Sequence, residues 1–132
     1  MEDKRPQELL SKGSISPGGE HAWKMEDVPK VIEAARIVGL ANLGGQPQFQ
    51  GPIGTAEPYW LDFGSTKRKT NEISQQYVDR SATETLTAFH QLCQSTDFEQ
   101  ESSDWSHIKA AKKKGIDPME HLWFVLYFGD NS

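Results

Sequence analysis

The sequence predicts an α+β protein in which a small sheet of three or four strands packs against helices, in the element order α-β-β-α-α-β. Two observations carry this prediction. Residues 72–94 have an apolar stripe at helical spacing, and residues 122–128 form an uninterrupted apolar run typical of a central strand. Because a single core commonly forms at about 100–150 residues, residues 1–132 are expected to make one domain.

The first helix is predicted over residues 28–38. Its apolar side chains recur at helical spacing and form one face, made of Val28, Val31, Ile32, Ala35 and Val38. Asp27 stands where an N-cap is expected, and Pro29 falls in the first turn, where its missing N–H costs nothing. Gly39 is a natural C-terminal stop. Residues 1–20 are polar and contain several Gly, Ser and Pro, so we expect a loosely ordered N-terminal arm.

Two strands are predicted after this helix, over residues 40–50 and 59–63. The first is interrupted by Gly44-Gly45, and residues 51–54 are typical of a turn or loop. Because so few residues join the two strands, an antiparallel pair is the simplest arrangement.

A loop, two helices and a last strand complete the predicted order. The loop, residues 64–71, is polar and is expected to be exposed. The helix over residues 72–94 has the clearest periodicity in the chain, with a stripe of Val78, Ala82, Leu86, Phe89 and Cys93. A shorter helix is predicted over residues 105–114, because its terminal lysines suit the negative end of a helix dipole. The strand over residues 122–128 is expected to be central and buried on both faces.

Composition and charge exclude some classes of function. Hydrophobic residues make up 36% of the chain and charged residues 25%, which fits a folded protein. The formal charge of −5 argues against nucleic acid as a partner and allows a basic one. The longest apolar run, seven residues, falls short of the roughly 20 that span a bilayer. With no apolar stretch near the N-terminus, the chain is expected to be cytoplasmic, with no membrane partner.

The sequence contains no recognisable catalytic or metal-binding motif. No Walker A loop, HExxH sequence or nucleophile elbow occurs. Cys93 is the single cysteine, and core packing is the favoured role for it although His90 lies three residues before it. We therefore expect no enzyme activity, no cofactor and no metal. A small-molecule or enzymatic site at Gly44-Gly45 remains the alternative, although a bulge or turn is favoured there.

Two short segments are candidates for binding a protein partner. In the strand predicted over residues 59–63, alternation puts Trp60 on the face opposite Leu61, so Trp60 is either an exposed anchor or buried beneath the 64–71 loop. The acidic stretch at residues 97–104 is either a solvated linker or a docking surface for a basic partner. The candidate partner-binding residues are Glu57, Trp60, Asp62, Asp97, Glu99 and Glu101.

Several short motifs, in this order, resemble those of a known family. They begin with Leu9-Leu10-Ser11-Lys12-Gly13, Ala22-Trp23 and the GLANLGG segment at residues 39–45. The 59–63 segment, Tyr77-Val78-Asp79-Arg80-Ser81 and the apolar closing strand follow. Over residues 8–128, the chain resembles the bacterial immunity proteins of polymorphic toxin systems, within which it is similar to the group catalogued as immunity protein forty.

The resemblance implies a cytoplasmic antidote that binds a cognate toxin domain and blocks it without turnover. The chain departs from the family pattern in the Gln and Pro residues at 46–52 and in the basic 64–71 loop. No functional residue carries over from the family, so the candidate residues above come from the sequence itself. The hypothesis is a toxin-binding protein; the alternatives are a small-molecule-binding or enzymatic domain, and an oligomerising structural module.

Overall fold

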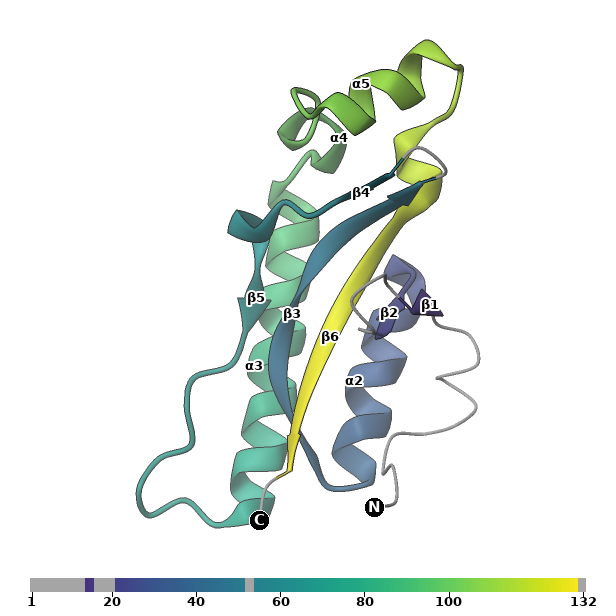
Figure 1. The fold of residues 1–132 in the computed structure, drawn as a ribbon. Coiled ribbons are helices and arrows are strands. Elements are labelled where there is room, and N and C mark those ends of the chain that lie inside the picture. Colours follow the sequence, from purple (N-terminus) through teal and green to yellow (C-terminus); the bar gives the residue numbers. More distant parts are fainter. Residues whose placement is uncertain (1–13, 16–20, 52–53, 131–132) are drawn as a thin grey trace.

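A computed structural model of the chain describes residues 14–15, 21–51 and 54–130. It confirms the α+β class: an open antiparallel sheet is packed against helices (Figure 1). Within the described residues the sheet has six strands, in the order β1-β2-β6-β3-β4, and β5 also pairs with β3. The arm expected over residues 1–20 lies outside the described residues, except for the short strand β1, Ser14–Ile15.

The centre of the sheet is one long antiparallel pair, β3 (Leu40–Gly51) with β6 (Leu122–Asp130). Their ladder runs from Leu40 opposite Asp130 to Phe49 opposite Leu122. Two helices, α2 (Val28–Ile37) and α3 (Ser74–Ser95), lie against this pair (Figure 1). Both helices and the last strand were predicted, with ends within two residues of those observed.

The core forms where alternate side chains of β6 meet the helices. Phe124 is fully buried, and its ring lies edge-on to those of Phe89, at 5.2 Å between centroids, and Phe98, at 5.6 Å. Such aromatic pairs add to the free energy gained by burying apolar area. On the other face of β6, Val125 is buried but Tyr127 is 37% exposed. The expectation of a strand buried on both faces is therefore correct only near its middle.

The prediction of three or four strands was too low because it missed very short strands. β2 (His21–Trp23) adds to the free edge of β6, while β4 (Gly54–Ala56) and β5 (Phe63–Gly64) pair with β3. Segments of two or three residues are too short to establish a period of two. The predicted 51–54 turn includes residues 52–53, which lie outside the described residues.

The strand predicted over residues 59–63 is wrong. Tyr59–Leu61 form a single 3-10 turn, η2, and only Phe63 and Gly64 reach the sheet. The backbone N–H of Leu61 donates to the carbonyl of Pro58, at 3.0 Å, and closes the turn. Aromatic residues favour strands where a neighbouring strand gives them a surface to pack on. In this segment β3 pairs with Phe63 and Gly64, and Tyr59–Leu61 lie before that pairing begins.

The remaining elements are short. A 3-10 turn, η1 (Met25–Asp27), leads into α2, and Asp27 stands at the N-cap position without a side-chain capping bond, contrary to expectation. The acidic stretch holds a one-turn helix that was not predicted, α4 (Phe98–Glu101), anchored by the buried Phe98. The predicted third helix is α5 (Ser106–Lys113), and η3 (Pro118–His121) precedes β6.

A β-bulge in β3 confirms the favoured interpretation of the glycine pair. The register with β6 shifts between Asn42 and Gly44, which leaves Leu43 as the extra residue. Gly44 has φ of +126°, and a Cβ on it would lie 2.2 Å from the carbonyl oxygen of Phe63. A Cβ on Gly45 would lie 2.2 Å from the carbonyl oxygen of Val125. The two glycines therefore let β5 and β6 approach β3 closely.

Buried polar groups at the bulge are satisfied by side chains from outside the strand. The Asn42 N–H donates to Ser81 Oγ at 3.0 Å, and the Asn42 carbonyl accepts from Ser65 Oγ at 2.6 Å. The Asn42 amide donates to the carbonyl of Ile32 at 3.3 Å. One residue thus ties the bulge to α2, to α3 and to the segment after β5. Leaving a buried donor or acceptor without a partner costs more free energy of folding than one hydrogen bond normally contributes.

We predict that Ser81→Ala destabilises the protein by about 1–3 kcal/mol, because the buried Asn42 N–H loses its acceptor. Ser95→Ala is the matched control, since Ser95 is exposed on the same helix and its hydroxyl donates only to the Gln91 carbonyl. The control is expected to change stability by less than about 0.5 kcal/mol. Urea unfolding curves measure both. Equal effects of the two substitutions would contradict the role assigned to Ser81.

Candidate functional site

Three aromatic side chains from two separate segments form an exposed cluster, here called the aromatic cluster: Tyr59, Trp60 and Trp105. The ring of Trp60 lies edge-on to Tyr59, at 5.4 Å between centroids, and to Trp105, at 5.7 Å. Tyr59 is 70% exposed and Trp60 is 44% exposed. Trp105 is half-buried and packs against the core. A single turn at η2 projects Tyr59 and Trp60 outward, and Trp105 supports them from the start of α5.

Of the two interpretations of Trp60, the structure supports the exposed one. Its indole contacts Trp105 rather than the 64–71 loop, which runs from β5 to the N-terminal end of α3 (Figure 1). The alternative in which that loop buries Trp60 is therefore wrong. In the η2 turn Trp60 is 44% exposed, so it is not buried.

The contact between Trp60 and Trp105 brings the two predicted acidic segments to one end of the molecule. Asp62 follows the η2 turn and is exposed, and Glu101 is exposed at the end of α4. Asp97 is also exposed and caps α4, accepting from the Gln100 N–H at 3.1 Å. These three carboxylates can meet a basic partner beside the aromatic cluster.

The other two candidate carboxylates are already engaged within the molecule. Glu57 is half-buried and accepts a hydrogen bond from the Gln48 amide. Glu99 pairs with Lys112 at 3.5 Å, and both side chains are 42% exposed. Each would have to exchange an internal contact for a partner, so we assign them a smaller role than Asp62, Asp97 and Glu101.

The sequence did not single out Trp105 or Tyr59 as binding residues. Trp105 was placed at the start of a helix, and Tyr59 was included only as part of the strand predicted over residues 59–63. The available signal was Pro58, directly before this segment, because proline favours a turn there over a strand. Nothing in the local sequence indicates that Trp105 meets Trp60, because 45 residues separate them.

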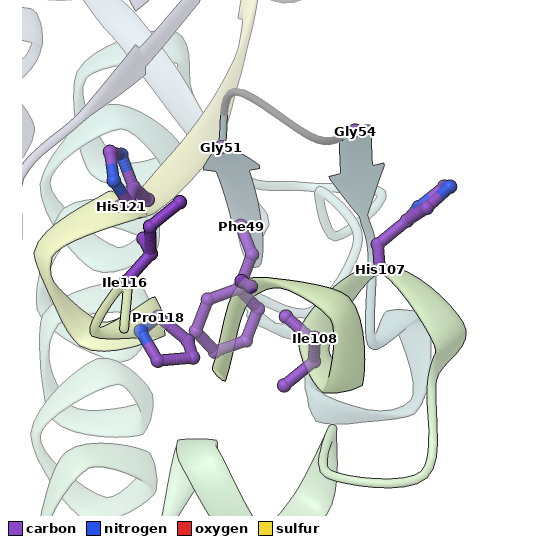
Figure 2. A pocket seen from close by; sticks show the side chains of 9 residues that line it. Phe49, Gly51, Gly54, His107, Ile108, Ile116, Pro118 and His121 are labelled. Atoms are coloured by element: carbon purple, nitrogen blue, oxygen red, sulfur yellow. The ribbon is translucent and has the colours of Figure 1, made fainter. Parts of the chain in front are cut away.

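A small apolar hollow lies between the β3–β4 hairpin, α5 and η3 (Figure 2). The side chains of Phe49, Ile108 and Pro118 converge there, and the imidazoles of His107 and His121 lie on opposite sides (Figure 2). Its free volume is about 20 Å³, which is room for roughly one water molecule. The hollow as described is too small for a substrate.

The features considered for catalysis or metal binding do not assemble a site in the described part of the chain. The side of Gly44 and Gly45 where a ligand would approach is filled by the Phe63 and Val125 backbones. Cys93 is half-buried, and burial raises the pKa of its thiol, which disfavours the reactive thiolate. His90 is exposed. Among the described residues, no three His, Cys, Asp or Glu side chains are grouped to hold a metal ion.

A network around Arg80 holds the basic loop against α3. The Arg80 guanidinium forms a two-point ion pair with Glu72, at 2.6 and 2.8 Å, and bonds to Glu84 at 3.0 Å. It also donates to the Lys67 carbonyl at 3.0 Å, while Glu84 accepts from the Thr66 N–H at 2.8 Å. The side chains of Arg80 and Glu72 are only 17% and 8% exposed.

This network shifts the pKa values of its members. The hydrogen bond from Arg80, followed by that from the Lys69 N–H, lowers the pKa of Glu72 to about 2. The bond from the Thr66 N–H chiefly lowers the pKa of Glu84. The bond to Glu72 chiefly raises the pKa of Arg80. All three groups are therefore held in their charged forms at neutral pH.

Comparison with family models, curated protein sequences and solved structures finds no match to this chain. None of the helices in the described ranges is both long enough and apolar enough to cross a membrane.

Two of the motifs that carry the resemblance contact each other in the buried framework of the fold. The 39–45 and 77–81 segments meet through the bond between Asn42 and Ser81, and the second segment also supplies Arg80. The exposed members of the aromatic cluster, Tyr59 and Trp60, fall in the 59–63 segment. The Leu9–Gly13 motif lies outside the described residues.

We predict that Glu72→Gln removes a pH-dependent part of the stability. Because folding lowers the pKa of Glu72 from about 4.5 to about 2, its contribution is fully present above pH 4.5. It is lost as the pH falls through the folded value. The melting temperature of the variant should lie below that of the wild type at pH 6, and the gap should shrink towards pH 2.

Thermal melts from pH 6 to pH 2 measure this gap, with Glu101→Gln in the exposed helix α4 as the charge-matched control. A gap that stays constant over the whole range would contradict the assigned ion pair.

Proposed function

We propose that this chain is a cytoplasmic binding protein that captures and neutralises a cognate toxin domain without catalysing a reaction. The observation that carries the proposal is the aromatic cluster, in which the exposed Trp60 contacts Trp105 on a surface that also holds exposed carboxylates. The order of the short motifs shared with immunity proteins supports the same function.

The aromatic cluster has the properties of an interface anchor. Trp and Tyr are enriched among the few residues that dominate binding energies, because they bury large areas and retain a polar group. The edge-on contact with Trp105 orients Trp60 before binding. An anchor that is already oriented loses less side-chain entropy when a partner covers it.

The charge around the cluster favours a basic partner. Asp62 directly follows η2, and Asp97 and Glu101 lie at the two ends of α4, shortly before Trp105 in the chain. All three are exposed, and the whole chain carries a formal charge of −5. Carboxylates at the rim of an interface accelerate encounter with a positively charged surface and reject acidic proteins. Toxins that act on nucleic acids present such surfaces, because they must bind phosphates.

The first experiment is growth rescue. The C-terminal domain of a large secreted protein encoded beside this chain is expressed in a test strain, with and without the chain, and viability is followed. Rescue that depends on a direct complex, isolated by size-exclusion chromatography, supports the proposal. If the domain is toxic and the chain neither binds it nor restores growth, that domain is not the cognate toxin.

We predict that Trp60→Ala weakens capture of the toxin domain by at least roughly tenfold, with the fold unchanged because Trp60 is 44% exposed. Ile73→Ala is the control, since Ile73 is 62% exposed at the opposite end of α3. Isothermal titration calorimetry gives both affinities, and circular dichroism checks the fold. Equal affinities for the wild type and Trp60→Ala would remove Trp60 from the interface.

A further inference from the structure

A second surface lies at the other end of α3. The loop between β5 and α3 carries three consecutive basic residues, Lys67, Arg68 and Lys69, in a chain with a formal charge of −5. It joins the N-terminal end of α3, whereas η2, the turn that carries Tyr59 and Trp60, lies beside the C-terminal part of α3 (Figure 1). The 22 residues of α3 span about 33 Å at 1.5 Å per residue. The two surfaces are therefore separate.

The path of this loop is fixed through its backbone. Arg80 donates to the Lys67 carbonyl at 3.0 Å, Glu84 accepts from the Thr66 N–H at 2.8 Å, and Glu72 accepts from the Lys69 N–H at 3.0 Å. These bonds do not use the basic groups of the Lys67 and Lys69 side chains, which are exposed. A loop held in this way presents its charges without a further loss of backbone entropy on binding.

The central guanidinium of the loop is also held in place. Arg68 Nε donates to the Glu72 carbonyl at 3.2 Å, and Nη2 donates to Ser74 Oγ at 3.3 Å. Its guanidinium lies 6.0 Å from the centre of the Tyr77 ring. The Arg68 side chain remains exposed, and these contacts fix the middle of the loop between Lys67 and Lys69.

The carboxylates nearest the loop are engaged with other groups. Glu72 and Glu84 pair with Arg80, and Asp79 pairs with Arg36 at 3.1 Å. The Lys69 ammonium adds slightly to the low pKa of Glu72. Among the described residues, no carboxylate forms an ion pair with Lys67 or Lys69, so their exposed ammonium groups can meet a partner.

We infer that this loop is a binding surface for an acidic protein segment that carries carboxylates and an apolar side chain. The carboxylates would meet the ammonium groups of Lys67 and Lys69, and the apolar side chain would cover Ile73, which is 62% exposed. This surface is independent of the proposed function.

A protein segment fits this surface better than a nucleic acid does. Nucleic acids need a broad basic face that tracks several phosphates, and here three basic residues stand next to acidic ones. A shallow open depression beside the loop is lined by Glu72 and Asp79 as well as by Lys69 and Arg80. The basic face is too small to follow several phosphates, whereas the exposed Ile73 gives an apolar contact that a peptide side chain can use and a phosphate cannot.

The test measures binding of a fluorescein-labelled peptide, DEDLEDE, by fluorescence anisotropy at low ionic strength. We expect the double substitution Lys67→Glu with Lys69→Glu to weaken binding by at least roughly tenfold. The control makes the same charge change on the exposed lysines at the end of α5, Lys113→Glu with Lys114→Glu. Equal losses in both variants, or tighter binding of a DNA duplex than of the peptide, would overturn the inference.

Glu84→Ala tests whether positioning matters in addition to charge. Removing a negative charge near the loop should strengthen peptide binding if only Coulomb forces act. Because Glu84 holds the Thr66 N–H and hydroxyl, we expect weaker binding instead. Thr66→Ala, which removes only the hydroxyl, gives the same test if Glu84→Ala does not fold. Unchanged or tighter binding would show that the Arg80 network does not position this surface.

Discussion

The bulge in β3 is the constraint on which the rest of the molecule depends. At this point two long strands must pair while a third segment, β5, approaches the same backbone. Gly44 and Gly45 provide the space, and Asn42 ties the bulged strand to both covering helices. A bulge bends a strand and increases its twist. The bond between Asn42 and Ser81 attaches α3 at this bend and so helps to set its angle to the sheet.

Both candidate surfaces follow from the position of α3. At its N-terminal end, Arg80 and Glu84 lie one turn apart and hold the basic loop. At its C-terminal end, the chain turns through α4, where the buried Phe98 contacts the ring of Phe124 in the core. That anchor sets where α5 begins and therefore where Trp105 meets Trp60. The exposed residues are thus placed by buried ones that a partner would not touch.

The sequence predicts the long elements well and the short ones poorly, for a physical reason. The apolar stripe of α3 repeats often enough to define a helical period, and the apolar run of β6 is long enough to indicate a buried strand without one. β2, β4 and β5 have two or three residues each, which is too short to show a period. They form strands because they lie beside β6 or β3 in the folded protein. The error at residues 59–63 has the same origin: composition favoured a strand, and the turn after Pro58 overrode it.

The candidate sites were predictable in part. Trp60 was identified because an aromatic residue stood among carboxylates, yet its support by Trp105 is a long-range contact that no local pattern contains. The engagement of Glu99 by Lys112 also joins two separate helices. In the same way, the basic loop could be read from consecutive residues, whereas its attachment to Arg80 depends on how the loop folds back along α3.

The length of α3 has a consequence for how the protein meets its surroundings. Its 22 residues extend over about 33 Å, about four times the Debye length of about 8 Å at physiological ionic strength. Mobile ions therefore screen side chains at one end of the helix from charges at the other. A charged partner that approaches one end is steered mainly by the side chains next to it, and added salt weakens that steering.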